Sequence, residues 1–94
     1  MNAQVSPEAN AIARLIKAQM AIKGVSQTKL ASILSISQSH LSRQLRGQAP
    51  FDLDQIFVAC HYLGVDPQEV LVRGIRMAKG SDEDHFSIVD AVIE

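Results

Sequence analysis

Two short segments with helical spacing of apolar residues, separated by a brief break, constrain the fold more than any other feature of this sequence. They occupy residues 26–47 (SQTKLASILSISQSHLSRQLRG), where Ser26 and Ser37 stand at the positions of helix caps. The second segment has only Leu41 and Leu45 as inward candidates, and most of its other residues are Ser, Gln and Arg. A helix meant only to fill a core would carry more apolar positions, so its polar face needs another explanation.

Three further helices are predicted by capping residues and terminating glycines, over residues 6–24, 52–64 and 66–80. The first begins with a capping Ser6 and with Pro7 at the first helical position. The fourth begins with Asp52 and Gln55, spaced as a capping box, and residues 66–69 (DPQE) have the same spacing. Five short helices with tight connections predict an all-α bundle.

The apolar residues at helical spacing define a candidate core. Its members are Ile12, Leu15, Ile16, Met20, Leu30, Ile33, Leu34, Leu41, Leu45, Leu53, Ile56, Phe57, Cys60, Leu63, Val70, Leu71 and Ile75. The single cysteine excludes an intrachain disulfide and a thiolate zinc cluster, and we expect Cys60 to be packed in this core. The neighbouring His61 points in a different direction on a helix, so the sequence predicts no metal site and no cofactor.

Charge divides the chain into residues 1–80 and residues 81–94. The first part carries nine basic and five acidic residues, or +4, and the second carries five acidic and no basic ones, or −5, which together give the net charge of −1. Six of the basic residues lie between Glu8 and Asp52, an interval without any acid. Because the placement of charge decides which face attracts a polyanion, this interval favours a nucleic-acid partner.

The polar residues of the third helix share one side of the helical wheel. At about 100° per residue they fall within an arc of about 140° that excludes Leu41 and Leu45; they are Gln38, Ser39, Ser42, Arg43 and Arg46. Amide, hydroxyl and guanidinium groups are those that read base edges, and the major groove admits one α-helix. The start of the preceding helix, at Ser26 and Gln27, presents unpaired backbone N–H groups that suit a phosphate.

Together these segments resemble the phage-repressor and Cro type of helix-turn-helix protein, also called the xenobiotic-response-element family. The resemblance is carried by Gln27, Leu30, Ala31, Leu34, Ile36, Ser37, Gln38, Ser39, Leu41, Ser42, Arg43, Arg46 and Gly47. The later LDQIFVACHYLGVDPQEVL resembles the family's fourth and fifth helices, so the likeness covers residues 9 to 72. It implies a five-helix, lambda-repressor-like bundle for residues 1–80, followed by a short C-terminal tail.

The resemblance also implies which residues contact DNA. Those expected to face bases are Gln38, Ser39, Ser42 and Arg43. Those expected to contact phosphates are Ser26, Gln27, Lys29, His40 and Arg46, although His40 can equally be an exposed bystander. Ala31 is expected where the two motif helices cross, because a larger side chain there would push them apart.

The chain departs from the family pattern at two positions. Ser35 stands in the turn where glycine is usual, and a non-glycine residue at positive φ costs about 1 kcal/mol. Gln44 stands where the family prefers an apolar residue. We therefore expect Leu45 to take over its packing role, with a slight rotation of the third helix.

The tail, residues 81–94 (SDEDHFSIVDAVIE), is both acidic and apolar. It can fold back on its own domain or mediate dimerisation, and its acids can also compete with DNA for the basic face. Dimerisation would lengthen the recognised site, since one recognition helix reads few base pairs and two-fold dimers read palindromic operators.

We interpret the sequence as a sequence-specific, double-stranded DNA-binding transcriptional regulator, a phage- or prophage-type repressor that acts by operator occlusion. The alternative is an antitoxin or other protein-interaction module whose tail binds a partner protein. No nucleophile–base–acid set is present, so an enzyme is not expected. The chain shows neither a signal peptide nor the roughly 18 consecutive apolar residues of a membrane span, which favours a cytoplasmic protein.

Overall fold

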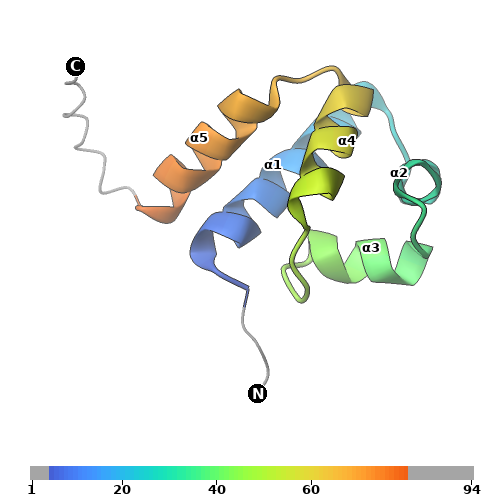
Figure 1. The fold of residues 1–94 in the computed structure, drawn as a ribbon, viewed down its shortest axis with the longest axis horizontal. Helices are drawn as coiled ribbons and strands as arrows, with labels where there is room; N and C mark the ends of the chain where they lie inside the picture. Colours follow the sequence, from blue (N-terminus) through green and yellow to red (C-terminus); the bar gives the residue numbers. More distant parts are fainter. Residues whose placement is uncertain (1–4, 81–94) are drawn as a thin grey trace.

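The computed structural model describes residues 5–80, and every regular element in that range is an α-helix (Figure 1). The helices are α1 (Pro7–Lys23), α2 (Gln27–Leu34), α3 (Gln38–Leu45), α4 (Leu53–Leu63) and α5 (Pro67–Ala78). The predicted all-α, five-helix architecture is confirmed, whereas the tail and its predicted role in dimerisation lie outside the described residues. Within the described range, no helix combines the length and the apolarity that a membrane crossing requires.

The first four helices begin at the predicted caps. The Oγ atoms of Ser6, Ser26 and Ser37 each accept a hydrogen bond from the backbone N–H three residues later, at 3.0 to 3.1 Å. Asp52 and Gln55 form the predicted capping box: the Gln55 N–H donates to Asp52 Oδ1 at 2.7 Å, and the Asp52 N–H donates to Gln55 Oε1 at 3.0 Å. Each bond satisfies an N–H group that the helix itself leaves unpaired.

The second predicted capping box, at the start of α5, is wrong. Asp66 Oδ1 accepts from the N–H of Gln68 at 3.0 Å, two residues later, and not from that of Glu69. The backbone explains the difference, because ψ is 117° at Asp66 and 155° to 171° at the other four caps. This rotation brings the carboxylate to the second helical residue, so Asp66 still caps α5 but alone.

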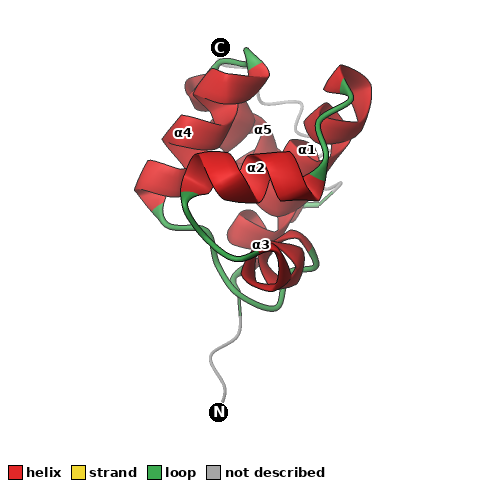
Figure 2. Cartoon of the chain, turned by 90° about the vertical axis from the view of Figure 1, so that its right-hand side faces the viewer, coloured by secondary structure: helices red, strands yellow, loops and turns green. Residues whose placement is uncertain are grey.

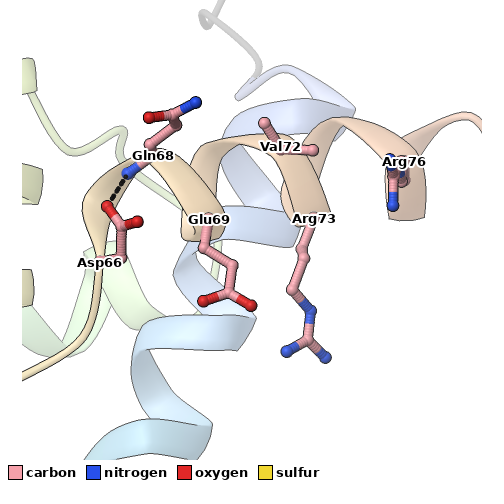
Figure 3. Close-up of a pocket in the computed structure, with 6 residues that line it drawn as sticks. All are labelled: Asp66, Gln68, Glu69, Val72, Arg73 and Arg76. Carbon is pink, nitrogen blue, oxygen red and sulfur yellow. Dashed lines mark hydrogen bonds between the residues drawn. The ribbon is translucent and has the colours of Figure 1, made fainter.

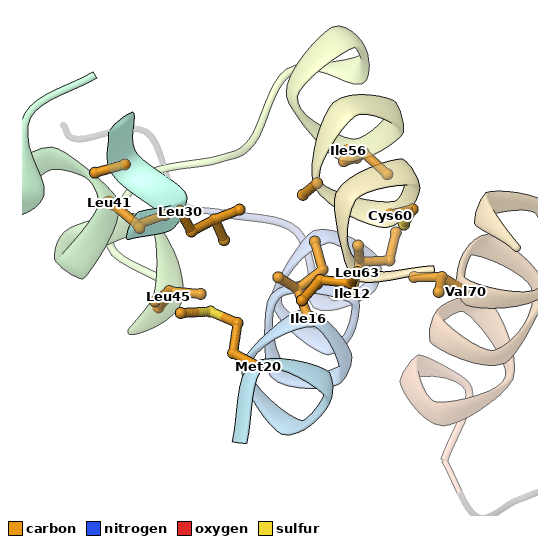
Figure 4. Close-up of a cluster of buried hydrophobic side chains, with 12 residues drawn as sticks. Ile12, Ile16, Met20, Leu30, Leu41, Leu45, Ile56, Cys60, Leu63 and Val70 are labelled. Carbon is orange, nitrogen blue, oxygen red and sulfur yellow. The ribbon is translucent and has the colours of Figure 1, made fainter. Parts of the chain in front are cut away.

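All five helices contribute to one apolar core, and the labelled side chains of Figure 4 point into it. α1 packs mainly against α5 and also contacts α3 and α4, while α2 packs against α3 and α4. The buried members of the cluster are Ile12, Ile16, Met20, Leu30, Ala31, Leu41, Leu45, Ile56, Ala59, Cys60, Leu63 and Val70. Most of the predicted core residues are thus confirmed, including Cys60, and Leu15, Ile33, Leu34 and Leu71 pack against them partly buried.

The predicted inward faces of α4 and α5 are wrong at three positions. Leu53 and Phe57 are 57% and 43% exposed, and Ile75 is 43% exposed. The inward places belong instead to Ala59 on α4 and to Gly74 on α5. Small residues there let each helix approach its neighbour closely, which turns the larger side chains toward solvent.

Candidate nucleic-acid interface

α2 and α3 form a helix-turn-helix. In Figure 1 α2 is seen end-on and α3 lengthwise, and in Figure 2 the reverse holds, so the two helices cross steeply. Ala31, which is 3% exposed, is one of only two fully buried residues of α2, as a close crossing requires. Between the helices Ser35 adopts the left-handed conformation, with φ 60° and ψ 41°, and the Ile36 N–H donates to the Ala31 carbonyl at 3.0 Å. The turn is therefore a normal left-handed helix end, built on serine in place of glycine.

The structure brings the four predicted base-contacting residues to one outward face of α3. Gln38, Ser39 and Arg43 are exposed, and Ser42 is partly exposed. The inward face is formed by Leu41, Gln44 and Leu45, which occupy the opposite side of the wheel. The outward side thus offers amide, hydroxyl and guanidinium groups and no carboxylate, the chemistry suited to base edges.

The predicted phosphate-contacting residues are accessible to solvent at the start of α2 and the end of α3. Ser26 and Lys29 are exposed and Gln27 partly exposed at the start of α2, and Arg46 is exposed just after α3. Ser26 Oγ already accepts the N–H of Lys29 at 3.1 Å, but its hydroxyl hydrogen remains a possible donor. The position of Gln27 leaves its backbone N–H without a helical acceptor, so it can point at an anion.

His40 is engaged with a neighbour on the same helix. Its Nδ1 lies 3.3 Å from Nη2 of Arg43, and the guanidinium is the donor because it has no acceptor atom. The two residues are three positions apart, a spacing that places side chains together on a helix surface. This contact was not predicted, although the spacing could have indicated it, and it joins Arg43 of the outward face to His40.

Gln44 is the largest correction to the predicted site. Leu45 is buried as expected, but it does not replace Gln44, which is 1% exposed. Gln44 Nε2 donates to the Pro50 carbonyl and to Gln55 Oε1, at 2.9 Å each. The expectation failed because an amide can occupy an inward position when folding supplies hydrogen-bond partners, and these partners lie on another helix and its preceding loop.

Neither the surroundings of Cys60 nor the surface of α5 forms a second site of the usual kind. Within residues 5–80, no three His, Cys, Asp or Glu side chains gather as metal ligands would, and burial together with the Asp66 carboxylate raises the pKa of the Cys60 thiol. Figure 3 shows a hollow along the outer side of α5, lined by Asp66, Gln68, Glu69, Val72, Arg73 and Arg76. It carries both signs of charge and is wide open to solvent, unlike the enclosed, mostly apolar sites of small ligands.

Comparisons with known proteins agree with this geometry. The BetR domain family matches residues 7–93. The clp gene regulator ClgR from Corynebacterium glutamicum appears in two similar crystal structures. One is 26% identical and covers 72% of this chain and 87% of its own, with a TM-score of 0.65. The other is 24% identical and covers 88% and 90%, with a TM-score of 0.71.

A third structure is the restriction-modification controller protein C.AhdI from Aeromonas hydrophila. It is 24% identical, covers 66% of this chain and 94% of its own, and gives a TM-score of 0.59. A comparison with curated proteins gave no match. The predicted resemblance to the xenobiotic-response-element type of helix-turn-helix is confirmed by these findings.

Proposed function

The chain belongs to the BetR domain family, and on that premise we propose that it is a sequence-specific, double-stranded DNA-binding transcriptional regulator. The outward face of α3 carries this proposal, because it presents only groups that can bond to base edges. The similar structures support it, since ClgR is named a gene regulator and C.AhdI a controller protein. The function is binding without catalysis.

In this function α3 lies in the major groove. The side chains that read bases are Gln38, Ser39, Ser42 and Arg43. The groups that hold phosphates are the N-terminus of α2 with Ser26, Gln27 and Lys29, together with His40 and Arg46. Gln38 can pair with adenine through two hydrogen bonds, and Arg43 with guanine.

The regulator acts as a repressor of phage or prophage type, in the cytoplasm, by covering an operator and excluding polymerase. It binds as a homodimer, because one short helix reads too few base pairs and a two-fold dimer doubles the site as a palindrome. A second copy of the chain has an apolar surface available on α4, where four large side chains are exposed: Leu53, Phe57, Val58 and Tyr62. Asp54 is the only acidic residue on this outer side of α4, and the rest of the surface is mainly apolar. Such a surface is suited to burial against its own copy.

The decisive experiment is selection of binding sites from a random duplex library, followed by footprinting of the selected site. We expect one consensus with two-fold symmetry and affinity that falls steeply with salt, with a log–log slope near −0.9 per neutralised phosphate. Sedimentation of the complex should give two chains per site. Failure to bind any duplex at low ionic strength would exclude the function, and an asymmetric site bound by one chain would exclude the dimer.

Arg43→Ala tests the assignment of α3. We expect a loss of about 1–3 kcal/mol of binding free energy on the selected site and relaxed preference at one base position. The matched control is Arg73→Ala, which removes the same charge from an exposed position on α5. In Figure 1 the helix α5 lies apart from α3. Equal effects of the two substitutions would show that Arg43 acts through charge alone and reads no base.

A further inference from the structure

Gln44 is a polar side chain enclosed in the inward face of the DNA-reading helix. It is 1% exposed and is flanked on α3 by the buried Leu41 and Leu45. A buried amide without partners is costly, so its hydrogen bonds determine whether this position can be tolerated at all.

The hydrogen bonds of Gln44 connect three successive parts of the chain. Its Nε2 donates to the carbonyl of Pro50, in the loop after α3, and to Oε1 of Gln55 on α4, both at 2.9 Å. The same Oε1 accepts the backbone N–H of Asp52 at 3.0 Å and thereby closes the α4 capping box. One continuous set of bonds therefore runs from the last turn of α3 to the first turn of α4, and we refer to Gln44, Pro50, Gln55 and Asp52 as the amide link.

The orientation of the Gln44 amide is fixed by its surroundings. With Nε2 in place, both neighbours are acceptors, whereas a flipped amide would put Oε1 against two oxygen atoms. The chosen orientation leaves Gln44 Oε1 buried without a partner. An apolar residue would avoid that unsatisfied oxygen, so the amide link is not the most stabilising solution for this position.

Directionality is what the amide link provides and apolar packing does not. α3 packs against α1 and α2, and those contacts permit small sliding. The two bonds from Gln44 Nε2, one to the loop and one to α4, have preferred directions and so restrict rotation of α3. The base-reading face lies on the opposite side of the same helix, so a rotation of α3 moves Gln38 and Arg43 directly.

We propose that Gln44 is a positioning residue that sets the orientation of α3 and thereby the register in which its outward face meets DNA. The proposal rests on the proposed DNA-binding function for its consequence, but its structural half can be measured without DNA.

The test is Gln44→Met, which keeps the length of the side chain and removes its hydrogen bonds. We expect the variant to fold with a melting temperature close to that of the parent. Its affinity for the selected operator should fall about tenfold, with a broadened consensus at the positions read by α3. Residual dipolar couplings of the DNA-free variant should show α3 reoriented relative to α4. Gln44→Leu serves as a second variant should methionine impair folding.

Two control variants separate positioning from general core damage. Gln55→Glu keeps an acceptor for both Gln44 Nε2 and the Asp52 N–H, so it should retain parental affinity. Ile56→Val trims a buried side chain one position away on α4 without touching the amide link, and it should lower stability while leaving the consensus unchanged.

Parental affinity and consensus in Gln44→Met, or an unmoved α3 in its couplings, would overturn the proposal. Absence of duplex binding by the parent chain would instead refute the proposed function, and the couplings would still decide whether Gln44 orients α3.

Discussion

The packing of α5 against α1 and the hydrogen-bonded link from α3 to α4 are built on different chemistry. α5 approaches α1 at Gly74, where an added Cβ would lie 2.5 Å from Cγ1 of Ile12, and the buried Val70 belongs to the same apolar cluster. α3 is joined to α4 by hydrogen bonds from Gln44 to Gln55 and to the preceding loop. The first contact depends on the complementary shapes of apolar side chains, and the second depends on the direction of hydrogen bonds.

This difference separates stability from orientation. Apolar burial is non-directional and contributes in proportion to the area removed from water, so the α1–α5 contact mainly stabilises the fold. The link between α3 and α4 leaves the buried Gln44 Oε1 unsatisfied and contributes less, but in our proposal it orients the helix that carries the outward polar face. Substitutions in the two regions should therefore have separable effects on unfolding and on DNA binding.

Gln44→Glu should have the largest effect, because it places a buried carboxylate against the Pro50 carbonyl and Gln55 Oε1. Neither oxygen can donate a hydrogen bond, so the charge is uncompensated, and we expect a loss of about 3–5 kcal/mol in the free energy of unfolding near neutral pH. Urea unfolding followed by circular dichroism measures it.

The pH dependence of stability in Gln44→Glu shows whether the buried charge causes the loss. Protonation removes the charge and restores one donor, so the variant should regain stability relative to the parent as the pH falls from about 8 to about 4. Gln68→Glu, which introduces the same charge at an exposed position, is the control and should stay near parental stability. A pH-independent loss in Gln44→Glu would mean that shape, and not hydrogen bonding, governs this contact.

Gly74→Ala tests the α1–α5 contact and should act on stability alone. The new Cβ would press on Ile12, an overpacking cost of about 1–3 kcal/mol, partly offset by the roughly 1 kcal/mol gained when alanine replaces glycine in a helix. The melting temperature should fall by several degrees, while operator affinity measured below the transition should stay unchanged. Adding Ile12→Ala removes the clash between Ile12 and the new Cβ. The double variant should therefore lose less stability than the sum of the losses in the two single variants. If the losses simply add, the clash with Ile12 is not the cause of the strain.

The fold was predictable from the sequence because its signals are local. Ser6, Ser26, Ser37 and Asp52 each bond within three residues, and Gly24 and Gly64 end α1 and α4 in the left-handed conformation. Such bonds are determined by neighbouring residues, whatever the tertiary structure. The inward faces of α4 and α5 were less predictable, because a close approach at Ala59 or Gly74 depends on the partner helix.

The candidate site was predictable in its outward half only. An arc of polar residues on α3 follows from the helical period, and the structure places that arc opposite Leu41. The inward half depends on Gln44, whose acceptors lie six and eleven positions along the chain and meet it only after the loop has folded. No local pattern predicts such a contact. The sequence therefore showed that Gln44 departs from the family pattern, but not that its side chain is buried and hydrogen-bonded.

Ser35→Gly should stabilise the protein, and by less than Gly74→Ala destabilises it. Gly24 and Gly64 end their helices at φ 70° and 73°, and Ser35 adopts the same left-handed region at φ 60°. Relief of the side-chain strain should raise the free energy of unfolding by about 0.5–1 kcal/mol, after the greater freedom of glycine in the unfolded chain is counted. Operator affinity should not change, because the turn geometry is kept. Ser32→Gly, at an exposed interior position of α2, is the control and should destabilise.

Cys60 provides the smallest effect and tests whether the apolar region opens. Burial, and to a lesser degree the Asp66 carboxylate, raises the pKa of its thiol above the ordinary value of 9.0. An acid whose pKa is raised by folding contributes its full stability below the unfolded value and loses it as the pH rises through the folded value. The free energy of unfolding should therefore contain no contribution from Cys60 titration between about pH 6 and pH 8, and it should fall above about pH 9 more in the parent than in Cys60→Ala. A thiol reagent should modify Cys60 of the native protein only at the rate of unfolding. Rapid modification would show that α4 separates from the core. It would also mean that directional hydrogen bonds, and not apolar burial, hold α4 in place.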